Sequence, residues 1–449
     1  MPPKVKPSPP SDIGHEARVF LEEHGIVPHK QTIRSSQWSG AGDPFGFYLT
    51  TILALKRAFT ESKALTAGSW AHAAAECHNN PQKYTETIAK TIKSMKEVGN
   101  ALRIPGDHCE AMLEREELYA KMAWAWWTIV SEIPMANGVK IANLFDASSN
   151  FHIVDQETTI RVPGSVALEG IETDVTIKPD AIAVNLKAKT FWIIDWKSTG
   201  FPPEERLSMC DNEFQCQLYG EVVANLHETG TLSKHVPPLE PYGDFKFGGV
   251  LHIAYGKPSI KFGQEDRPYR WVSDGKRKGI WATLEVVNQK FRIKRMGSDR
   301  VWSYSSGYSS EEDALAAMHE YTGKKPEKQF EDEPDFNIYI HRCTDWYHAT
   351  GQYSHLAAER NTSPIVNMST VTIEHLRQPR IQHEYQSRMR ILDDLHRRKP
   401  HPELFPKANN PLGMGQTPSK SPYFPFYVCP IEQWPAIILD KQLIQSPRD

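Results

Sequence analysis

Two carboxylates and one lysine lie at defined places within residues 178–199. Branched and aromatic apolar residues flank the polar segment 185–190, and this pattern predicts two β-strands joined by a turn. Asp180 stands on the first strand, Asp195 ends the apolar run of the second, and Lys197 follows two residues later. Because side chains alternate along a strand, Asp195 and Lys197 are expected to point to the same face.

Two carboxylates beside an ammonium group suit the hydrolysis of phosphodiesters with a divalent metal ion. Mg²⁺ and Mn²⁺ bind carboxylate oxygens and keep water in their open positions. Such an ion polarises a phosphate oxygen and lowers the pKa of a neighbouring water, while Lys197 would orient that water or offset charge developing on the phosphate. The alternative is structural, with both aspartates at loop edges and Lys197 extending from a strand end.

Further motifs accompany this pair of strands. Asp195 comes 15 positions after Asp180 (195 minus 180), so Pro-Asp is followed at this spacing by Asp-x-Lys. Gln215 and Tyr219 are four residues apart, one helical turn, in the segment expected to cross over after the second strand. Upstream, the sequence Gly-Ser-Trp-Ala-His ending at His72 opens an alanine-rich helical segment. Together the four motifs resemble the RecB-like exonuclease branch of the PD-(D/E)xK nuclease superfamily.

This resemblance covers roughly residues 31–255 and implies both a fold and a site. The implied fold is α/β, a restriction-endonuclease-like core with a central mixed β-sheet flanked by helices. Asp174 competes with Asp180 for the first carboxylate position. The site residues implied by the resemblance are the metal ligands His72, Asp180, Asp195 and the backbone carbonyl of Trp196, the catalytic lysine Lys197, and the pair Gln215 and Tyr219, which would position the lysine and the DNA backbone.

The cofactor expectation is Mg²⁺ or Mn²⁺ without an iron–sulfur cluster. Many RecB-like nucleases hold such a cluster with one early and three late cysteines, and a cubane cluster needs four thiolates. Here Asp43 stands at the early cysteine position, and Cys429 is the one cysteine left in the late segment. The six cysteines form no C-x-x-C pair and are typical of thiols in a reducing compartment.

The charge balance excludes a global basic field as the basis of nucleic-acid binding. The chain carries 52 basic and 55 acidic residues, a net charge of −3, so any DNA-binding surface must be local. The sequence contains no run of about 18 apolar residues, and its first residues lack the apolar core of a signal peptide. A soluble, intracellular, cytoplasmic protein is therefore expected, and the resemblance implies a bacterial or phage source.

Residues 251–300 form a locally basic segment, with 12 basic and 5 acidic side chains. Aromatic residues interleave with the charges, and the pattern predicts antiparallel hairpins with a basic face suited to phosphates. The alternative is a solvated, charged face of a sheet extension. The candidate nucleic-acid contacts are Lys276, Arg277, Lys278, Arg292, Lys294 and Arg295.

The predicted organisation has four parts. A Pro-rich, disordered tail occupies residues 1–12, and a nuclease core with a helical insertion at about 80–135 occupies residues 13–255. A basic β-rich extension over 256–310 and a helical, Pro-rich region over 311–449, packing on the core, form a C-terminal α+β extension. Within the core, apolar residues spaced by three and four predict a helix over 47–59.

The sequence thus predicts a metal-dependent deoxyribonuclease. An exonuclease acting in DNA recombination, repair or degradation on single- or double-stranded ends is the first interpretation, and a recombination or helicase protein is the expected kind of partner. A structure-specific endonuclease is one alternative. The other is a catalytically silent DNA-binding or assembly subunit, although such a descendant would have no chemical need for Lys197.

Overall fold

The structure is a computed structural model, and it divides the chain into two compact units. The first comprises residues 1–257 and 351–449, and the second residues 258–350. The boundary predicted at residue 310 lies inside the second unit. The structure describes residues 32–41, 47–53, 55–57, 63–78, 80–101, 104–135, 137–200, 202–210, 213–274, 280–287, 290–296, 302–349, 365–397, 433, 436–437 and 443–445. The predicted tail 1–12 and the Pro-rich segment 400–430 lie outside these ranges.

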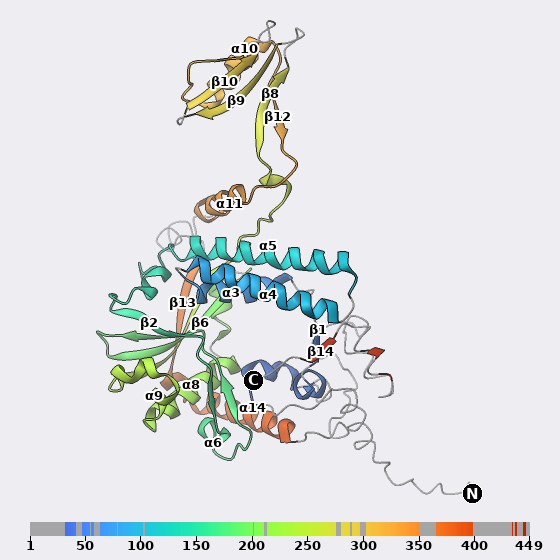
Figure 1. The fold of residues 1–449 in the computed structure, drawn as a ribbon. Helices are drawn as coiled ribbons and strands as arrows, with labels where there is room; N and C mark the ends of the chain where they lie inside the picture. The colour runs from blue at the N-terminus through green and yellow to red at the C-terminus, as the bar shows by residue number, and fades with distance from the viewer. Residues whose placement is uncertain are drawn as a thin grey trace, which may run out of the picture. The chain divides into compact units, whose positions relative to one another are not determined.

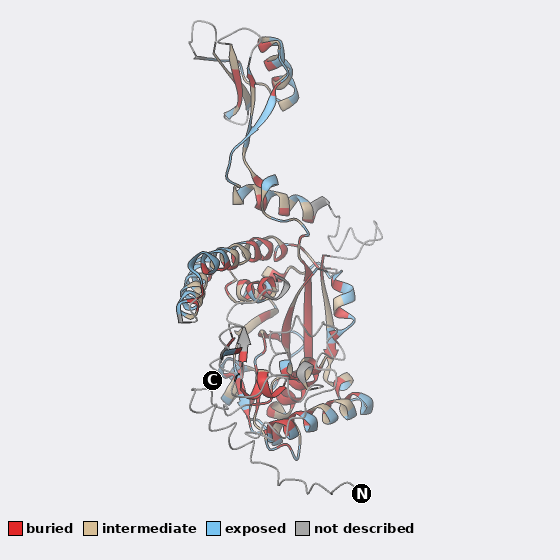
Figure 2. Ribbon diagram, turned by 90° about the vertical axis from the view of Figure 1, so that its right-hand side faces the viewer, coloured by how far each residue is buried: buried red, intermediate tan, exposed pale blue. Residues whose placement is uncertain are grey.

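A mixed sheet forms the centre of the first unit (Figure 1). In the described part of the chain it has five strands, and β6 and β7 run parallel while all other neighbours run antiparallel. The central strands are mostly buried (Figure 2), as their apolar runs predict. In spatial order the strands are β13 (Val366–Thr372), β7 (Lys246–Gly256), β6 (Thr190–Thr199), β5 (Ala181–Asn185) and β2 (Phe151–Gln156).

Helices flank this sheet, which confirms the predicted α/β class. Helix α3 packs against α5 and β6, whereas α8 packs against β7 and α14. Two shorter sheets pair β3 with β4 and β1 with β14. The bounds are α3 (Lys63–Glu76), α4 (Pro81–Ala101), α5 (Gly106–Val130), α6 (Gly164–Ala167), α7 (Pro203–Leu207), α8 (Phe214–Glu228), α9 (Leu232–His235), α13 (Ile373–Leu376), α14 (Pro379–Arg397), η1 (Ser35–Gly40), η2 (Tyr48–Ile52), η3 (Ile141–Phe145), η5 (Pro237–Tyr242), β1 (Leu55–Arg57), β3 (Ile160–Val162), β4 (Val175–Ile177) and β14 (Leu443–Gln445).

The predicted helical insertion is present as α4 and α5, but the predicted helix over 47–59 is wrong. The chain forms one short π-helix, η2, and then strand β1, which pairs with β14. Residues in η2 are buried in the main core. The partner strand β14 is nearly 400 residues away along the chain, so a tertiary contact overrides the local helical spacing here.

The second unit is an antiparallel sheet with one helix packed on it. Its strand order is β11-β10-β9-β8-β12, and α10 covers the face that presents Leu284 and Ile293. Ser310 caps α10, since its side chain accepts a hydrogen bond from the backbone N–H of Asp313. The bounds are η6 (Gln264–Asp266), β8 (Tyr269–Asp274), β9 (Trp281–Val287), β10 (Lys290–Met296), β11 (Trp302–Tyr304), α10 (Glu311–Thr322), β12 (Glu327–Phe330) and α11 (Phe336–Ala349).

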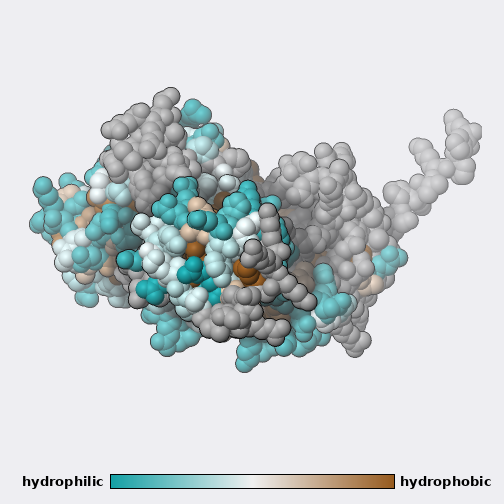
Figure 3. All heavy atoms as spheres, turned by 90° about the horizontal axis from the view of Figure 1, so that it is seen from above, coloured by the Kyte–Doolittle hydropathy of each residue, from teal (hydrophilic) through white to brown (hydrophobic). Residues whose placement is uncertain are grey.

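The visible surface of the described residues is mostly hydrophilic in Figure 3, with small hydrophobic areas between charged and polar side chains. Within the described ranges, no helix combines the length and the apolar character that crossing a membrane requires.

Candidate active site

The β5–β6 hairpin and helix α3 bring the first carboxylate and the histidine together. Asp180 immediately precedes β5, and its Oδ2 accepts a hydrogen bond of 2.7 Å from the backbone N–H of Trp196 in β6. Nδ1 of His72, in α3, lies 3.3 Å from the same oxygen. The competing candidate Asp174 instead pairs with Arg161 at 3.1 Å. The structure therefore places Asp180, and not Asp174, beside His72.

The second carboxylate, Asp195, lies in a cluster with Lys197 and Gln215. Nζ of Lys197 is 3.0 Å from Oδ1 and 2.9 Å from Oδ2 of Asp195. The amide of Gln215, in the first turn of α8, donates to Oδ1 at 3.1 Å and accepts from Lys197 at 3.2 Å. Strand alternation puts the aspartate and the lysine on one face, as predicted, and α8 closes that face.

Lys197 also faces a second carboxylate, which the sequence analysis did not assign to the site. Oε2 of Glu213 lies 3.9 Å from Nζ, and Oε1 of Glu213 pairs with Arg206 at 2.6 Å. Burial alone would lower the pKa of Lys197, but the charge of Asp195 outweighs it and raises the pKa. Lys197 is therefore an ammonium group at neutral pH and cannot accept a proton from water.

His252 is a further contact of Asp195 that the sequence analysis missed. Its Nδ1 lies 2.7 Å from Oδ2 of Asp195, and its side chain is 1% exposed. Burial would lower the pKa of His252, but the hydrogen bond to Asp195 outweighs it and raises the pKa. Conversely, burial would raise the pKa of Asp195, and the hydrogen bond from His252 together with the charge of Lys197 lowers it. Asp195 is thus held as a carboxylate between two cationic groups.

A bulge in β7 determines which residue lies beside Asp195. Phe191 lies opposite Phe247, but Trp192 lies opposite Gly249, so Gly248 is an extra residue in β7. A Cβ at Gly248 would collide with the Trp192 ring, and Gly249 has a φ of 127°, which other residues rarely adopt. Because of this shift His252 lies opposite Asp195. If the register of Phe191 and Phe247 continued without the shift, Leu251 would lie opposite Asp195 instead.

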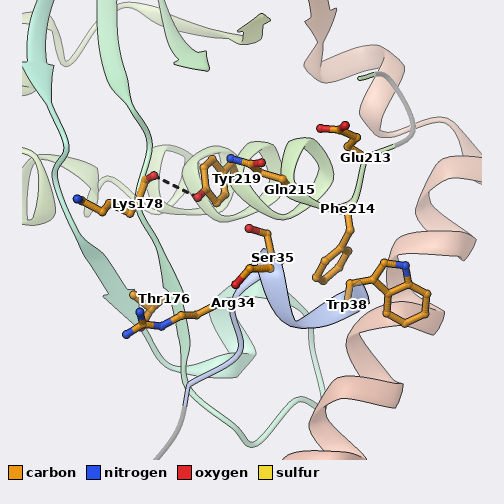
Figure 4. A pocket seen from close by; sticks show the side chains of 10 residues that line it. Arg34, Ser35, Trp38, Thr176, Lys178, Glu213, Phe214, Gln215 and Tyr219 are labelled. Carbon is orange, nitrogen blue, oxygen red and sulfur yellow. Dashed lines mark hydrogen bonds between the residues drawn. The ribbon is translucent and has the colours of Figure 1, made fainter. Parts of the chain in front are cut away.

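Tyr219 contacts the backbone ahead of Asp180. Its hydroxyl donates a hydrogen bond of 3.1 Å to the carbonyl of Lys178 (Figure 4), whereas Gln215, one turn earlier on α8, is the residue that contacts Lys197. The structure thus links Tyr219 to the segment that enters β5, two residues before the carboxylate.

Replacing Tyr219 by phenylalanine is expected to lower the free energy of unfolding by about 1 kcal/mol, because the carbonyl of Lys178 loses the donor of a partly buried hydrogen bond. We expect the rate of DNA cleavage to fall less than tenfold, since the reacting groups remain. Urea unfolding followed by fluorescence measures the first effect. Tyr242→Phe is the matched control, because no described residue bonds its hydroxyl; equal losses in both variants would contradict the assignment.

The donors at the site fit a hard divalent ion in kind, but they are not arranged around one point. Among the described residues, no three histidine, cysteine or carboxylate side chains stand ready to hold a metal ion. Asp195 already accepts three hydrogen bonds, two of them at Oδ1, and Nζ of Lys197 also lies 2.9 Å from Oδ2, so both acceptor positions of Oδ1 are taken. Oδ1 of Asp180 accepts none from the described residues. A metal bound by both carboxylates would therefore have to replace Lys197 or Gln215 at Oδ1 of Asp195.

The three predicted nucleic-acid contacts that the structure describes do not share one face of the second unit's sheet. Residues 276–278 lie outside the described ranges. Arg292 and Lys294 alternate with the buried Ile293 in β10, so they lie on the sheet face away from α10. Lys294 is 3.7 Å from Glu285 on that face. Arg295 is on the opposite face, with its guanidinium 5.1 Å from the ring centre of Tyr321 in α10.

Comparison with known families agrees with this geometry. Residues 43–245 match the model of the PD-(D/E)XK nuclease superfamily. The match contains every motif residue from His72 to Tyr219 and ends before His252. This part of the chain is therefore similar to nucleases of that superfamily, which generally use divalent metals such as Mg²⁺ or Mn²⁺. No curated protein matches the chain.

Proposed function

We propose that the chain is a metal-dependent deoxyribonuclease of the RecB-like kind that hydrolyses DNA from its ends. The observation that carries this proposal is the cluster in which Lys197 and Gln215 both bond Oδ1 of Asp195, next to the pair formed by His72 and Asp180. A purely structural ion pair would not need a second carboxylate and a histidine at the adjoining strand end. The resemblance to RecB-like exonucleases favours ends over internal positions.

The residues have separate roles in this proposal. His72, Asp180, Asp195 and the carbonyl of Trp196 would hold Mg²⁺ or Mn²⁺, which supplies Lewis acidity and a water of lowered pKa. Lys197, which stays protonated, donates hydrogen bonds to the attacking water or to the phosphate and balances charge there. Gln215 keeps the ammonium in place through its carbonyl, 3.2 Å from Nζ. Arg292 and Lys294 are proposed as phosphate contacts of the second unit.

The test is digestion of linear DNA labelled at the 5′ or the 3′ end, single- and double-stranded, beside a closed circle. Reactions contain Mg²⁺, Mn²⁺ or EDTA. We expect the linear substrates alone to be degraded, only with metal, and the label released first gives the direction. Cleavage of the circle would replace the exonuclease by the structure-specific endonuclease. DNA binding without cleavage under either metal would favour the silent binding or assembly subunit.

A further inference from the structure

A pocket of about 460 Å³ has Gln215, which contacts Asp195, in its lining (Figure 4). Its lining comes from η1, from residues around the end of β4, and from the start of α8. Gln215 both lines the pocket and contacts Asp195 and Lys197, so the pocket is continuous with the candidate active site. Its volume is within the range of sites that enclose small organic groups. A group bound there would lie next to the residues that act on the phosphodiester.

The pocket has a cationic side and an aromatic side. In Figure 4 the guanidinium of Arg34 lies on one side, and the rings of Trp38 and Phe214 lie on the other. The hydroxyl-bearing Ser35 lies between them. The ammonium of Lys178 points outward and pairs with Glu157, and the carboxylate of Glu213 lines the pocket near Phe214. A nucleotide has the same division, because its phosphate is anionic and its base presents a flat π-face that stacks on aromatic side chains.

The aromatic side is held in place by contacts on several elements. Ile33 joins η1 to β4 through two backbone hydrogen bonds. The N–H of Ile33 donates to the carbonyl of Asp174 at 2.8 Å, and the N–H of Thr176 donates to the carbonyl of Ile33 at 2.9 Å. The Trp38 ring lies 6.0 Å from that of Phe214, centre to centre, and the guanidinium of Arg388 is 5.3 Å from the Trp38 ring. A stacking platform fixed in this way loses little conformational entropy on binding.

We propose that this pocket binds one unpaired nucleotide of the substrate strand next to the phosphodiester that is cleaved, with its base stacked on Trp38 and its phosphate at Arg34. This inference rests on the proposed function, since it names the part of the substrate that the site takes. An unpaired base has an exposed face for stacking, whereas a base within a duplex is stacked on its neighbours. The enzyme would therefore act on a single strand or on a frayed end.

The test is a scan of abasic positions in a fluorescent single-stranded oligonucleotide. Binding is measured in EDTA, where metal-dependent cleavage does not occur, for the wild type, Trp38→Ala and Trp38→Phe. For the wild type we expect one or two adjacent abasic positions to weaken binding roughly 5- to 100-fold, and the others to have little effect. In Trp38→Ala an abasic site at the same positions should weaken binding less than about twofold, because the base it removes no longer has a ring to stack on. Trp38→Phe should retain most of the positional effect.

The scan of the wild type requires no change in the protein, so a flat profile overturns the inference even if Trp38→Ala fails to fold. An identical profile in the wild type and in folded Trp38→Ala also overturns it. Arg34→Ala should keep the profile but reduce the slope of log affinity against log salt by about one. Cleavage with Mn²⁺ is measured separately. A positional effect that depends on Trp38, without any cleavage, refutes the proposed function alone. Cleavage together with a flat abasic profile refutes the nucleotide site alone.

Discussion

Replacing Lys197 by alanine is expected to slow metal-dependent DNA cleavage by roughly 10²–10³-fold, the usual loss when a group that stabilises developing charge is removed. The reason is geometric, because Nζ of Lys197 lies 2.9–3.0 Å from both oxygens of Asp195 and 3.2 Å from Gln215. Among the described residues, no other lysine contacts Asp195 or Gln215. Single-turnover cleavage of the labelled linear DNA, at saturating Mn²⁺, is the measurement.

Two further variants separate the charge of Lys197 from its shape. Lys197→Gln keeps donors but loses the charge, and we expect it to be as slow as Lys197→Ala. Lys197→Arg keeps the charge on a planar fork that cannot occupy the same position, so its rate should be intermediate. If Lys197→Gln cleaves at the rate of the wild type, the charge has no role in the chemistry.

The matched control is Lys189→Ala, at the opposite end of the same hairpin, where the lysine is exposed and pairs with Asp244 at 3.4 Å. It should cleave at the rate of the wild type. Thermal unfolding must accompany both variants, because Asp195 is 2% exposed and loses one of its two cationic neighbours in Lys197→Ala. A folded Lys197→Ala that cleaves as fast as the wild type would remove Lys197 from the site and with it the proposed mechanism.

The part of the site that sequence could predict is the part set by local periodicity. Alternation along β6 places Asp195 and Lys197 on one face, and the spacing of four between Gln215 and Tyr219 places them on one side of α8. Both relations hold within a single element, and the structure keeps them. The central sheet was predictable for the same reason, because each of its strands in the motif region carries its own apolar run.

The relations that sequence could not predict join elements far apart in the chain. The segment over 47–59 has helical spacing, yet β1 forms there because β14 pairs with it. Trp38 lines the pocket because Ile33 bridges to β4, more than 130 residues later, and no motif marks that contact. Local patterns carry no information about such pairings, which depend on which strand edges are left to be covered.

His252 shows the same limit within the active site. The apolar run over residues 248–255 is typical of a strand, but it carries no information about the partner or the register of that strand. One inserted residue, Gly248, decides that His252 and not its neighbour lies opposite Asp195. The residue also lies outside the segment 43–245 that matches the superfamily. A residue brought in by strand register has no signature of its own in a single sequence.

We expect His252 to orient Asp195 through one hydrogen bond, and three substitutions separate that bond from packing. Asparagine places its amide N–H close to the position of Nδ1, whereas glutamine places it near Nε2, which is not the atom that contacts Asp195. Phenylalanine keeps the ring without a donor. His252→Gln and His252→Phe should raise the Mn²⁺ concentration for half-maximal cleavage 10- to 100-fold, the usual cost of losing a partner that orients a metal ligand.

His252→Asn is the decisive variant, because it loses ring volume and charge but retains the donor to Oδ2 of Asp195. If the hydrogen bond fixes the carboxylate, the Mn²⁺ concentration for half-maximal cleavage by His252→Asn should be less than about five times that of the wild type. The Mn²⁺ dissociation constants of the variants, measured directly by calorimetry, should rank in the same order as these concentrations. If the charge of the imidazolium matters instead, Asn and Gln should be equally impaired while both remain folded. If only packing matters, Phe should behave like the wild type, and His252 would be a core residue that touches the site without orienting it.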